Sequence, residues 1–520
     1  MPNRLSPAHL EAPLKGLATV LLSLLGSSTA VAADCAALEA LELSDVRIVS
    51  VEDRVAGPFV IRGGREEVTI ALPAFCRVAA VGIPTPDSEI RFEVWLPVET
   101  AWNGRLLGTG NGGYTGAIQY RTLADGLRQG YAVAGSDTGH SGSDLSFGFG
   151  HPEKIADWGH RAVHVMTEAA KPIARARYGR FPHHAYFSGC STGGHQALSE
   201  AQRYPGDYDG ILAGAPGHNR TRLNAGFLWS WLALHDEAGE PLLTPDQLSL
   251  VTAAVVSSCD ARDGVTDGLI GDPRHCRFDP AVLRCDGAGD ADCLTGEQVE
   301  AVRKVYAGPR NPRTGARIFA GWPAGSETLP GGRGGWAGYL LAPSAPMRQD
   351  YWARWVFGDP GWDYRTFDWD RDIAYADARM TMVDATDADL SVFRAGGGKL
   401  LLYAGWADSV VPPDDTVAYY EAVQAASGGA DAATAFARLF MAPGMAHCGG
   451  GPGPDSFDGL SALVRWVEEG VAPDRLIASK VNGGVVERTR PLCPYPRVAR
   501  YTGSGSTDEA ERFRCVVPRE

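Results

Sequence analysis

Residues 34 to about 100 of the chain alternate between apolar and polar positions in short runs. Residues 68–72 and 90–96 form two such runs, and each has the two-residue period that is typical of a half-buried β-strand. Polar and turn-forming residues separate the runs from each other. We therefore predict a β-rich entry segment from residue 34 to about residue 100.

From residue 105 to residue 217 the pattern becomes an alternation of strands and helices. Residues 105–107, 131–134 and 184–187 are short apolar runs that predict buried strands, whereas 157–178 carries apolar side chains at helical spacing. Strands that alternate with helices usually form a parallel or mostly parallel sheet. This part of the sequence therefore predicts an α/β fold.

The strand–helix rhythm disappears after residue 217. Residues 218–388 are rich in Trp, Gly, Pro and Asp, and strand-like runs return only at 399–404 and 437–441, followed by a predicted helix at about 457–470. The simplest interpretation is one α/β domain that is interrupted by an insertion. The predicted parts are a domain of residues 34–217 and 389–520 and a lid domain of residues 218–388.

The composition is that of a folded protein with an acidic surface. The chain has 520 residues, of which 44% are hydrophobic and 21% charged, and a formal net charge of −14 at pH 7. An acidic surface offers no basic footprint for phosphate groups. We therefore expect neither nucleic acid nor an anionic membrane as a partner.

Residues 1–33 have the features of a signal peptide. Arg4 and Lys15 supply positive charge, residues 17–25 form an apolar run, and small residues precede Asp34. The alternative is a buried N-terminal helix. The run is too short to cross a bilayer comfortably, and the sequence has no other apolar stretch of about twenty residues. We expect a secreted or periplasmic protein.

Ten cysteines agree with export. An even number of cysteines in an oxidising compartment favours disulfides, with free buried thiols as the alternative. Zinc is less favoured, because the sequence contains no pair of CxxC hooks. The count alone leaves the pairing open.

The strongest candidate for chemistry is Ser191. It lies at the centre of Gly189-Cys190-Ser191-Thr192-Gly193, a G-x-S-x-G pattern between a predicted strand and a predicted helix. This is the context of the nucleophile elbow of the α/β-hydrolase fold, in which a sharp turn exposes the serine hydroxyl above the sheet. The alternative is an ordinary strand–helix turn whose serine only caps the helix.

A nucleophilic serine needs a base, and the base needs a carboxylate that orients it. In the α/β-hydrolase fold these follow in the order Ser, acid, His. Asp408 follows the strand at 399–404, and His447 follows the strand ending near residue 441 in a glycine-flanked loop. Asp414 and Asp415 are the competing acids, but they are placed where carboxylates stabilise the start of the next helix.

A glycine-rich loop follows the early strand at 105–107. Residues 108–113 formally match G-x-G-x-x-G, but no convincing helix follows them, and a lone match of this kind is weak evidence for a dinucleotide site. In a hydrolase such a loop brings a backbone N–H to the developing oxyanion. We predict Gly112 and Thr192 as the two donors. The rival to an enzyme is a non-catalytic binding module on a hydrolase scaffold, and the intact Ser, Asp and His argue against it.

These motifs resemble those of the tannase and feruloyl esterase family, which includes the bacterial mono(2-hydroxyethyl) terephthalate hydrolases. The matching segments run in order along nearly all of the mature chain. They are Trp102-Asn103-Gly104-Arg105, Gly110-Asn111-Gly112-Gly113, Gly189-Cys190-Ser191-Thr192-Gly193-Gly194, residues 208–216, Asp408 and His447-Cys448. The resemblance implies a serine carboxylic-ester hydrolase that forms an acyl-enzyme.

The resemblance also implies how the cysteines pair. A disulfide between Cys190 and Cys448 would join the neighbours of the nucleophile and the base and limit their drift apart. The other implied pairs are Cys35–Cys76, Cys259–Cys276, Cys285–Cys293 and Cys493–Cys515.

A structural calcium site in the lid is a further implication of the resemblance. Its ligands would be the carboxylates of Asp260, Asp263 and Asp267 and the backbone carbonyls of Val265 and Leu269. Oxygen donors of this kind suit a hard cation, although the spacing is not that of an EF-hand. An Asp/Gly-rich surface turn is the alternative.

For the substrate, the resemblance implies an ester of an aromatic acid: a galloyl, feruloyl or related hydroxycinnamoyl ester, or else a terephthalate monoester. Arg333 would suit the free carboxylate of a terephthalate monoester, and Glu327 the phenolic hydroxyls of a gallate. Aromatic residues of the lid could stack on a flat acyl group, although such residues more often belong to a core. The candidates are Trp322, Trp336, Tyr339, Trp352 and Trp355.

Overall fold

A computed structural model describes most of the chain downstream of the predicted signal peptide. The described residues are 33–61, 67–286, 292–329, 335–341 and 345–518. Residues 1–32 of the predicted signal peptide, and Arg333, lie outside them. Within the described residues, no helix combines the length and the apolar character needed to cross a membrane.

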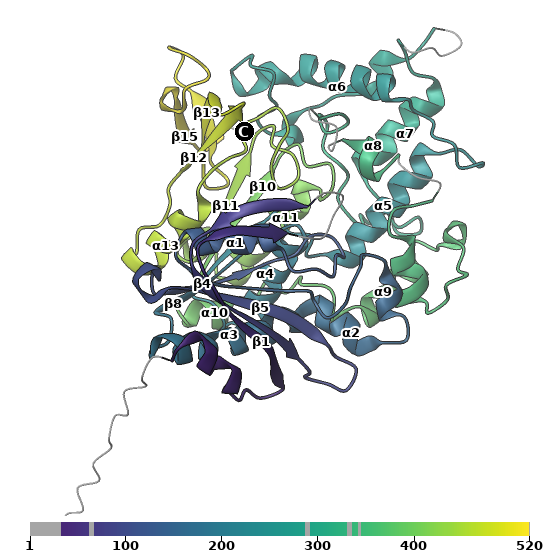
Figure 1. The fold of residues 1–520 in the computed structure, drawn as a ribbon. Coiled ribbons are helices and arrows are strands. Elements are labelled where there is room, and N and C mark those ends of the chain that lie inside the picture. The colour runs from purple at the N-terminus through teal and green to yellow at the C-terminus, as the bar shows by residue number, and fades with distance from the viewer. Residues whose placement is uncertain (1–32, 62–66, 287–291, 330–334, 342–344, 519–520) are drawn as a thin grey trace, which may run out of the picture.

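In the described part of the chain, nine strands form one sheet in the order β1-β4-β5-β7-β6-β8-β9-β10-β11 (Figure 1). Strands β7 to β11 in that order are parallel, whereas β1, β4 and β5 extend one edge by antiparallel pairing. The bounds are β1 Val46–Arg54, β4 Phe75–Gly82, β5 Ile90–Pro97, β6 Arg105–Thr109, β7 Ala132–Ser136, β8 His184–Cys190, β9 Gly210–Gly214, β10 Lys399–Gly405 and β11 Ala437–Ala442. The predicted α/β class is confirmed.

Helices cover both faces of this sheet. Successive side chains of a strand point to opposite faces, and in β10 Leu400 and Leu402 pack with α3, α4 and α11, whereas Leu401 packs with α13 and α1. The bounds of these helices are α1 Tyr120–Arg128, α3 Ala162–Tyr178, α4 Thr192–Arg203, α11 Pro413–Ala426 and α13 Gly459–Glu469. The remaining short helices of this part are α2 Pro152–Ala156, α10 Ser391–Ala395 and α12 Ala430–Thr434.

The helix predicted at 157–178 begins earlier than the sequence pattern indicated. A single helical stretch runs from Pro152 through a π-helical turn at Asp157–Arg161 into α3. The turn buries Asp157, whose carboxylate accepts a hydrogen bond from Arg161, so the residue predicted to begin the helix lies inside a longer helical stretch.

Residues between Gly214 and Lys399 form an insertion, because β9 and β10 are adjacent parallel strands. Figure 1 shows its helices α6, α7 and α8 gathered beside the sheet, away from its two faces. The bounds are α5 Arg220–Leu234, α6 Pro245–Cys259, α7 Gly296–Ala307, α8 Trp336–Tyr339 and α9 Arg371–Arg379. The predicted lid boundaries at 218 and 388 stay a prediction.

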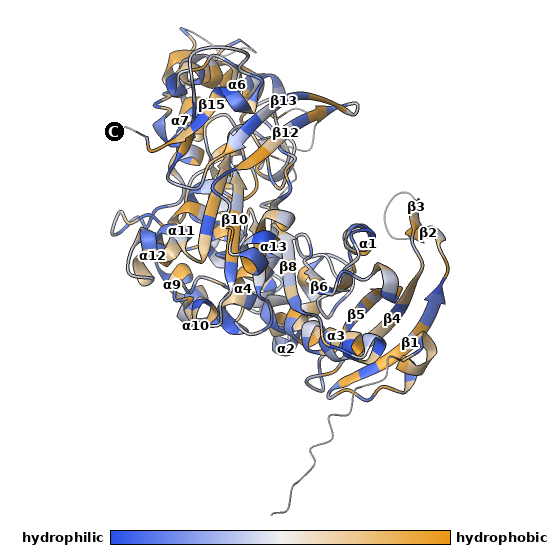
Figure 2. Cartoon of the chain, turned by 90° about the vertical axis from the view of Figure 1, so that its left-hand side faces the viewer, coloured by the Kyte–Doolittle hydropathy of each residue, from blue (hydrophilic) through white to orange (hydrophobic). Residues whose placement is uncertain are grey.

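Three hairpins complete the described chain. They are β2 Gly57–Ile61 with β3 Val68–Leu72, β12 Leu476–Asn482 with β13 Val485–Leu492, and β14 Val498–Tyr501 with β15 Phe513–Val516. In β13, Arg490 pairs with Asp267 of the insertion at 2.5 Å, so the C-terminal tail is tied to the insertion. Figure 2 shows α6 and α7 and the antiparallel edge of the sheet at opposite ends of the molecule.

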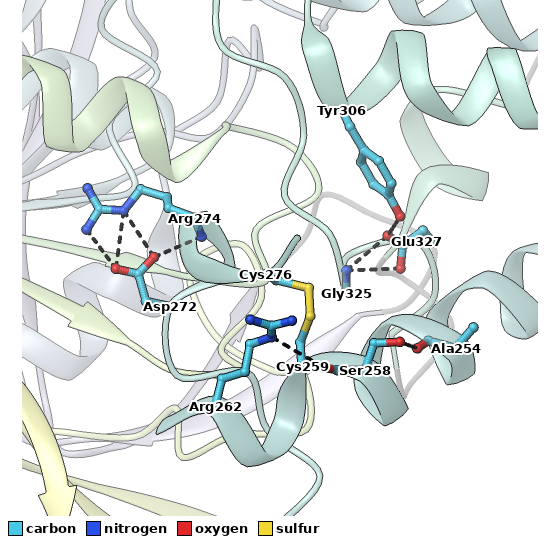
Figure 3. The surroundings of a disulfide bond; sticks show 10 residues. All are labelled: Ala254, Ser258, Cys259, Arg262, Asp272, Arg274, Cys276, Tyr306, Gly325 and Glu327. Carbon is cyan, nitrogen blue, oxygen red and sulfur yellow. Dashed lines mark hydrogen bonds and ion pairs between the residues drawn. A yellow bond between two sulfur atoms is a disulfide. The ribbon is translucent and has the colours of Figure 1, made fainter. Parts of the chain in front are cut away.

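The structure contains five disulfides within the described residues, and they join the pairs that the family resemblance implies. The pairs are Cys35–Cys76, Cys190–Cys448, Cys259–Cys276, Cys285–Cys293 and Cys493–Cys515. Cys259–Cys276 closes the end of α6 onto the next loop (Figure 3).

Candidate active site

Ser191 lies in a tight turn between β8 and α4. Its backbone has φ 64° and ψ −117°, a strained conformation for a residue with a side chain. Close backbone approach requires glycine at Gly189 of the pattern and at Gly194 just beyond it: a Cβ on Gly189 would lie 2.5 Å from the Gly193 carbonyl oxygen, and one on Gly194 would lie 2.3 Å from that of Gly214. The G-x-S-x-G pattern thus produces the elbow geometry that the sequence predicted.

Asp408 and His447 lie in the loops that follow β10 and β11, and they contact each other. His447 Nδ1 and Asp408 Oδ2 are 2.8 Å apart. The other carboxylate oxygen accepts hydrogen bonds from the N–H groups of Val410 at 2.8 Å and Val411 at 2.9 Å. Asp408 is fully buried whereas His447 is partly exposed. The Asp408 carboxylate is therefore held in place by backbone hydrogen bonds. Its contact with Nδ1 in turn orients the imidazole ring of His447.

The Cys190–Cys448 disulfide joins the serine loop to the histidine loop. Cys190 precedes Ser191, and Cys448 follows His447, with 5.9 Å between the two Cα atoms. This covalent link holds the two loops at the same end of the parallel strands.

The glycine-rich loop after β6 packs against the serine turn. A Cβ on Gly110 would lie 2.4 Å from Gly193 Cα, and the Gly193 N–H donates to the Asn111 carbonyl at 2.8 Å. The Thr192 hydroxyl donates to the Gly113 carbonyl at 2.7 Å. The structure therefore brings the loop that contains Gly112 next to Thr192. No helix follows directly, since α1 begins at Tyr120.

The competing acids face other partners. Asp414 Oδ2 lies 3.7 Å from Arg317, and Asp415 lies 3.5 Å from His218. Burial raises the pKa of both carboxyl groups. Their interactions are with the insertion and its entry segment, and neither is hydrogen-bonded to His447.

Most of the aromatic residues considered for the acyl pocket belong to packed cores. Each of four tryptophans is at most 4% exposed, and three of them donate the indole N–H to a neighbouring oxygen atom. Tyr339 differs, because it is only half-buried, and its ring stacks near Phe227. The four tryptophans are Trp322, Trp336, Trp352 and Trp355. The density of aromatic residues thus reflects core packing, as it does in most folded domains.

Glu327 does not fit a role in binding a phenolic acid. It is 1% exposed, and its carboxylate accepts hydrogen bonds from Tyr306 at 2.5 Å and from the Gly325 N–H at 2.9 Å (Figure 3). It also accepts one from Thr252 at 3.0 Å. Burial raises its pKa. The glutamate organises the interior of the insertion, and no local sequence pattern distinguishes that role from a place in a pocket.

The loop proposed for calcium contains the expected oxygen donors. Asp260 accepts hydrogen bonds from the Asp267 and Gly268 N–H groups, and Asp263 accepts one from the Val265 N–H at 3.0 Å. Burial, reinforced by the charges of Asp267 and Asp260, raises the pKa of Asp263 to about 6. Within the described residues, however, no three acidic, His or Cys side chains converge as a metal-binding group.

Two residues at the site escaped the sequence analysis. The buried Arg220, the first residue of α5, donates a hydrogen bond to the Thr192 hydroxyl at 3.1 Å, and its guanidinium lies 5.3 Å from the ring centre of Tyr114. No local pattern marks Arg220, since its contact with Thr192 arises from tertiary packing, whereas Tyr114 directly follows the glycine-rich loop and could have been found from that position.

Comparisons with known proteins agree with this architecture. The sequence profile described as tannase and feruloyl esterase matches residues 76–516. An uncharacterized esterase of Xanthomonas campestris is 41% identical, covering 97% of this chain and 95% of that protein. Mono(2-hydroxyethyl) terephthalate hydrolase of Piscinibacter sakaiensis is 35% identical, covering 86% of each chain.

A solved structure supports the same relationship. The crystal structure of feruloyl esterase B from Aspergillus oryzae superposes with a TM-score of 0.86 at 30% identity, covering 93% of this chain and 100% of that one. Likeness in both sequence and fold over nearly the whole length shows that this chain belongs to the tannase and feruloyl esterase family and is a carboxylic ester hydrolase of the α/β-hydrolase fold.

Proposed function

We propose that the protein hydrolyses esters through an acyl-enzyme formed on Ser191. The observation that carries this proposal is the contact between His447 Nδ1 and Asp408 in a loop that is covalently tied to the serine turn. This arrangement supplies a nucleophile, a base and an orienting carboxylate, which together define serine hydrolase chemistry on several unrelated folds.

The chemical steps follow from these positions. Ser191 Oγ attacks the ester carbonyl carbon while His447 Nε2 takes the hydroxyl proton, since Nδ1 is engaged by Asp408. The N–H groups of Gly112 and Thr192 stabilise the oxyanion. Collapse of the tetrahedral intermediate expels the alcohol, which receives the proton from His447. Water then repeats the sequence and releases the acid.

Replacement of the serine tests this mechanism. Ser191→Ala should lower kcat by about 10⁴- to 10⁶-fold, as expected for loss of a triad nucleophile. The matched control is Ser199→Ala, because Ser199 is a buried serine of the adjoining helix α4 whose hydroxyl has no hydrogen-bond partner among the described residues. A fluorophosphonate probe should label the wild type and the control but not Ser191→Ala. A wild-type protein that resists the probe would instead be a binding module.

We propose esters of aromatic acids as substrates, with galloyl and feruloyl or other hydroxycinnamoyl esters ranked above terephthalate monoesters. The named activities of the relatives support this class. The test is a comparison of kcat/KM on methyl gallate, methyl ferulate and mono(2-hydroxyethyl) terephthalate. A clear preference for a simple aliphatic ester over all three would reject the proposal and leave the triad untouched.

We also propose that the protein is exported and cleaved near Ala33. Five disulfides within the described residues support an oxidising compartment. Intact mass of protein recovered from the periplasm or medium should match a chain that lacks the first 33 residues. Recovery of the uncleaved chain in the cytoplasm would reject export.

Calcium binding by the loop of residues 260–269 is a further proposal. Asp260, Asp263 and Asp267 would hold the ion together with the carbonyls of Val265 and Leu269, since a hard cation prefers oxygen donors of this kind. When bound, calcium would supply structural stabilisation of the insertion. Chelation should lower the Tm and readdition of Ca²⁺ should restore it. Metal analysis that finds no calcium in protein prepared without chelator would contradict the proposal.

A further inference from the structure

Arg220 is a buried cation in direct contact with the proposed oxyanion hole. The residue is 5% exposed, and one of its terminal N–H groups donates to the Thr192 hydroxyl at 3.1 Å. Thr192 in turn donates to the Gly113 carbonyl at 2.7 Å. The guanidinium therefore lies at the start of a hydrogen-bonded chain that joins both proposed oxyanion donor segments.

Among the described residues, no carboxylate neutralises the charge of Arg220. In the described part of the chain no acidic group lies within ion-pair distance, and the buried Nε–H has no hydrogen-bond acceptor. The guanidinium instead lies beside the stacked rings of Tyr114 and Trp158, whose centres are 4.5 Å apart, at 5.3 Å from the Tyr114 centre and 5.2 Å from the Trp158 centre. Aromatic faces attract cations but leave the net charge in place.

The position of Arg220 on its helix adds to the local positive potential. It is the first residue of α5, where a cation is unfavourable because the helix dipole is already positive at that end. Thr192 is likewise the first residue of α4. Two helix N-termini and one unpaired guanidinium thus lie together, and an anion is the species that such an arrangement stabilises.

We propose that Arg220 is a positioning residue that also stabilises the oxyanion formed during ester hydrolysis. It holds Thr192 against Gly113 through its hydrogen bond, and its charge acts on the oxyanion through a buried region in which water provides little screening. This inference rests on the proposed serine mechanism. It assigns a role to Arg220, whose contact with Thr192 is a tertiary contact that the sequence alone does not indicate.

The proposal predicts a specific kinetic signature. Arg220→Met should lower kcat on p-nitrophenyl acetate by roughly 10- to 100-fold, less than loss of a direct oxyanion donor, with KM changed by no more than about threefold. Affinity for phenylboronic acid, whose adduct with Ser191 carries a tetrahedral anion, should fall by a similar factor. Arg220→Lys, which retains the charge but not the planar fork, should lie between the wild type and Arg220→Met.

Arg222→Met is the matched control, because Arg222 lies on the same helix and pairs with Asp377 at 2.8 Å. Its kcat should equal that of the wild type. The inference is overturned if Arg220→Met keeps its kcat, if only KM changes, or if Arg220→Lys and Arg220→Met lose equal activity at the same Tm. If Arg220→Met does not fold, Arg220→Gln replaces it.

Fluorophosphonate labelling separates this inference from the mechanism on which it rests. Labelling of wild-type Ser191 together with an unaffected Arg220→Met variant refutes the role of Arg220 alone. Wild-type protein that is not labelled refutes the serine mechanism and the role of Arg220 with it.

Discussion

Replacement of Asp408 by Asn probes the orientation of the catalytic base with almost no change in volume. In the wild type one carboxylate oxygen accepts from Val410 and Val411, and the other faces His447 Nδ1 at 2.8 Å. The asparagine amide oxygen can keep both backbone N–H bonds only if its NH₂ group faces Nδ1. Turning the amide around would forfeit two hydrogen bonds, about 1 kcal/mol each, and oppose donor to donor.

The introduced amide should therefore stabilise the imidazole tautomer of His447 that cannot act as the base. Nδ1 must then accept a hydrogen bond from the introduced NH₂ group, which leaves the proton on Nε2 and no base for the Ser191 hydroxyl. We expect kcat to fall by about 10³- to 10⁴-fold, equivalent to roughly 4–5.5 kcal/mol of barrier. The assay is hydrolysis of p-nitrophenyl acetate, accompanied by a Tm measurement to confirm folding.

Asp414→Asn is the matched control for this experiment. Asp414 is a partly exposed acid only six positions further along the chain, and its nearest cation is Arg317 at 3.7 Å. Its replacement should leave kcat unchanged. An Asp408→Asn variant that folds and keeps more than about a tenth of wild-type activity would refute the argument from tautomers, as would an equal loss in Asp414→Asn.

Two further predictions concern the Cys190–Cys448 disulfide and the ion pair between Arg105 and Glu468. Reduction of Cys190–Cys448, or its replacement by two alanines, should abolish activity before the fold is lost. Loop closure over 258 residues corresponds to about 5.6 kcal/mol of stabilisation from this bond. Full activity in the folded double variant would contradict the prediction. Hydrogen bonds from Arg105 lower the pKa of Glu468 from 4.5 to about 2. The contribution of the Glu468 carboxylate to stability is thus complete above about pH 4.5 and is lost as the pH falls towards 2. The Tm difference between the wild type and Glu468→Gln should therefore shrink over that range. A constant Tm difference would contradict this prediction.

The sequence predicted those features that depend on local pattern. The strands at 399–404 and 437–441 agree with β10 and β11 to within one residue, because each is a dense apolar run. Ser191, Asp408 and His447 stood out because each directly follows a strand in a glycine-containing loop. The structure brings Asp408 and His447 into contact, while the catalytic roles stay a prediction.

Features that depend on tertiary packing could not be predicted in the same way. Glu327 could equally have faced a substrate or the interior, and only the contacts of Tyr306 and Thr252 decide for the interior. Arg220 shows the reverse: no sequence pattern singled it out, arginines are mostly exposed in folded proteins, and the fold buries this one beside Thr192. Buried charges of this kind contradict local preference, and such contradictions concentrate at functional sites.

The order of strands explains why a covalent link is useful at this site. Asp408 and His447 follow the adjacent strands β10 and β11, so a hydrogen bond suffices to join them. Ser191 follows β8, which is three strand spacings from β11, or about 14 Å in the plane of the sheet. The chain between these strands also includes the whole insertion after β9. The loops that follow β8 and β11 approach each other beyond the strand ends, where Cys190 and Cys448 lie 5.9 Å apart between Cα atoms. Because their disulfide joins these loops directly, movement of the insertion against the sheet need not change the separation of the serine and histidine loops.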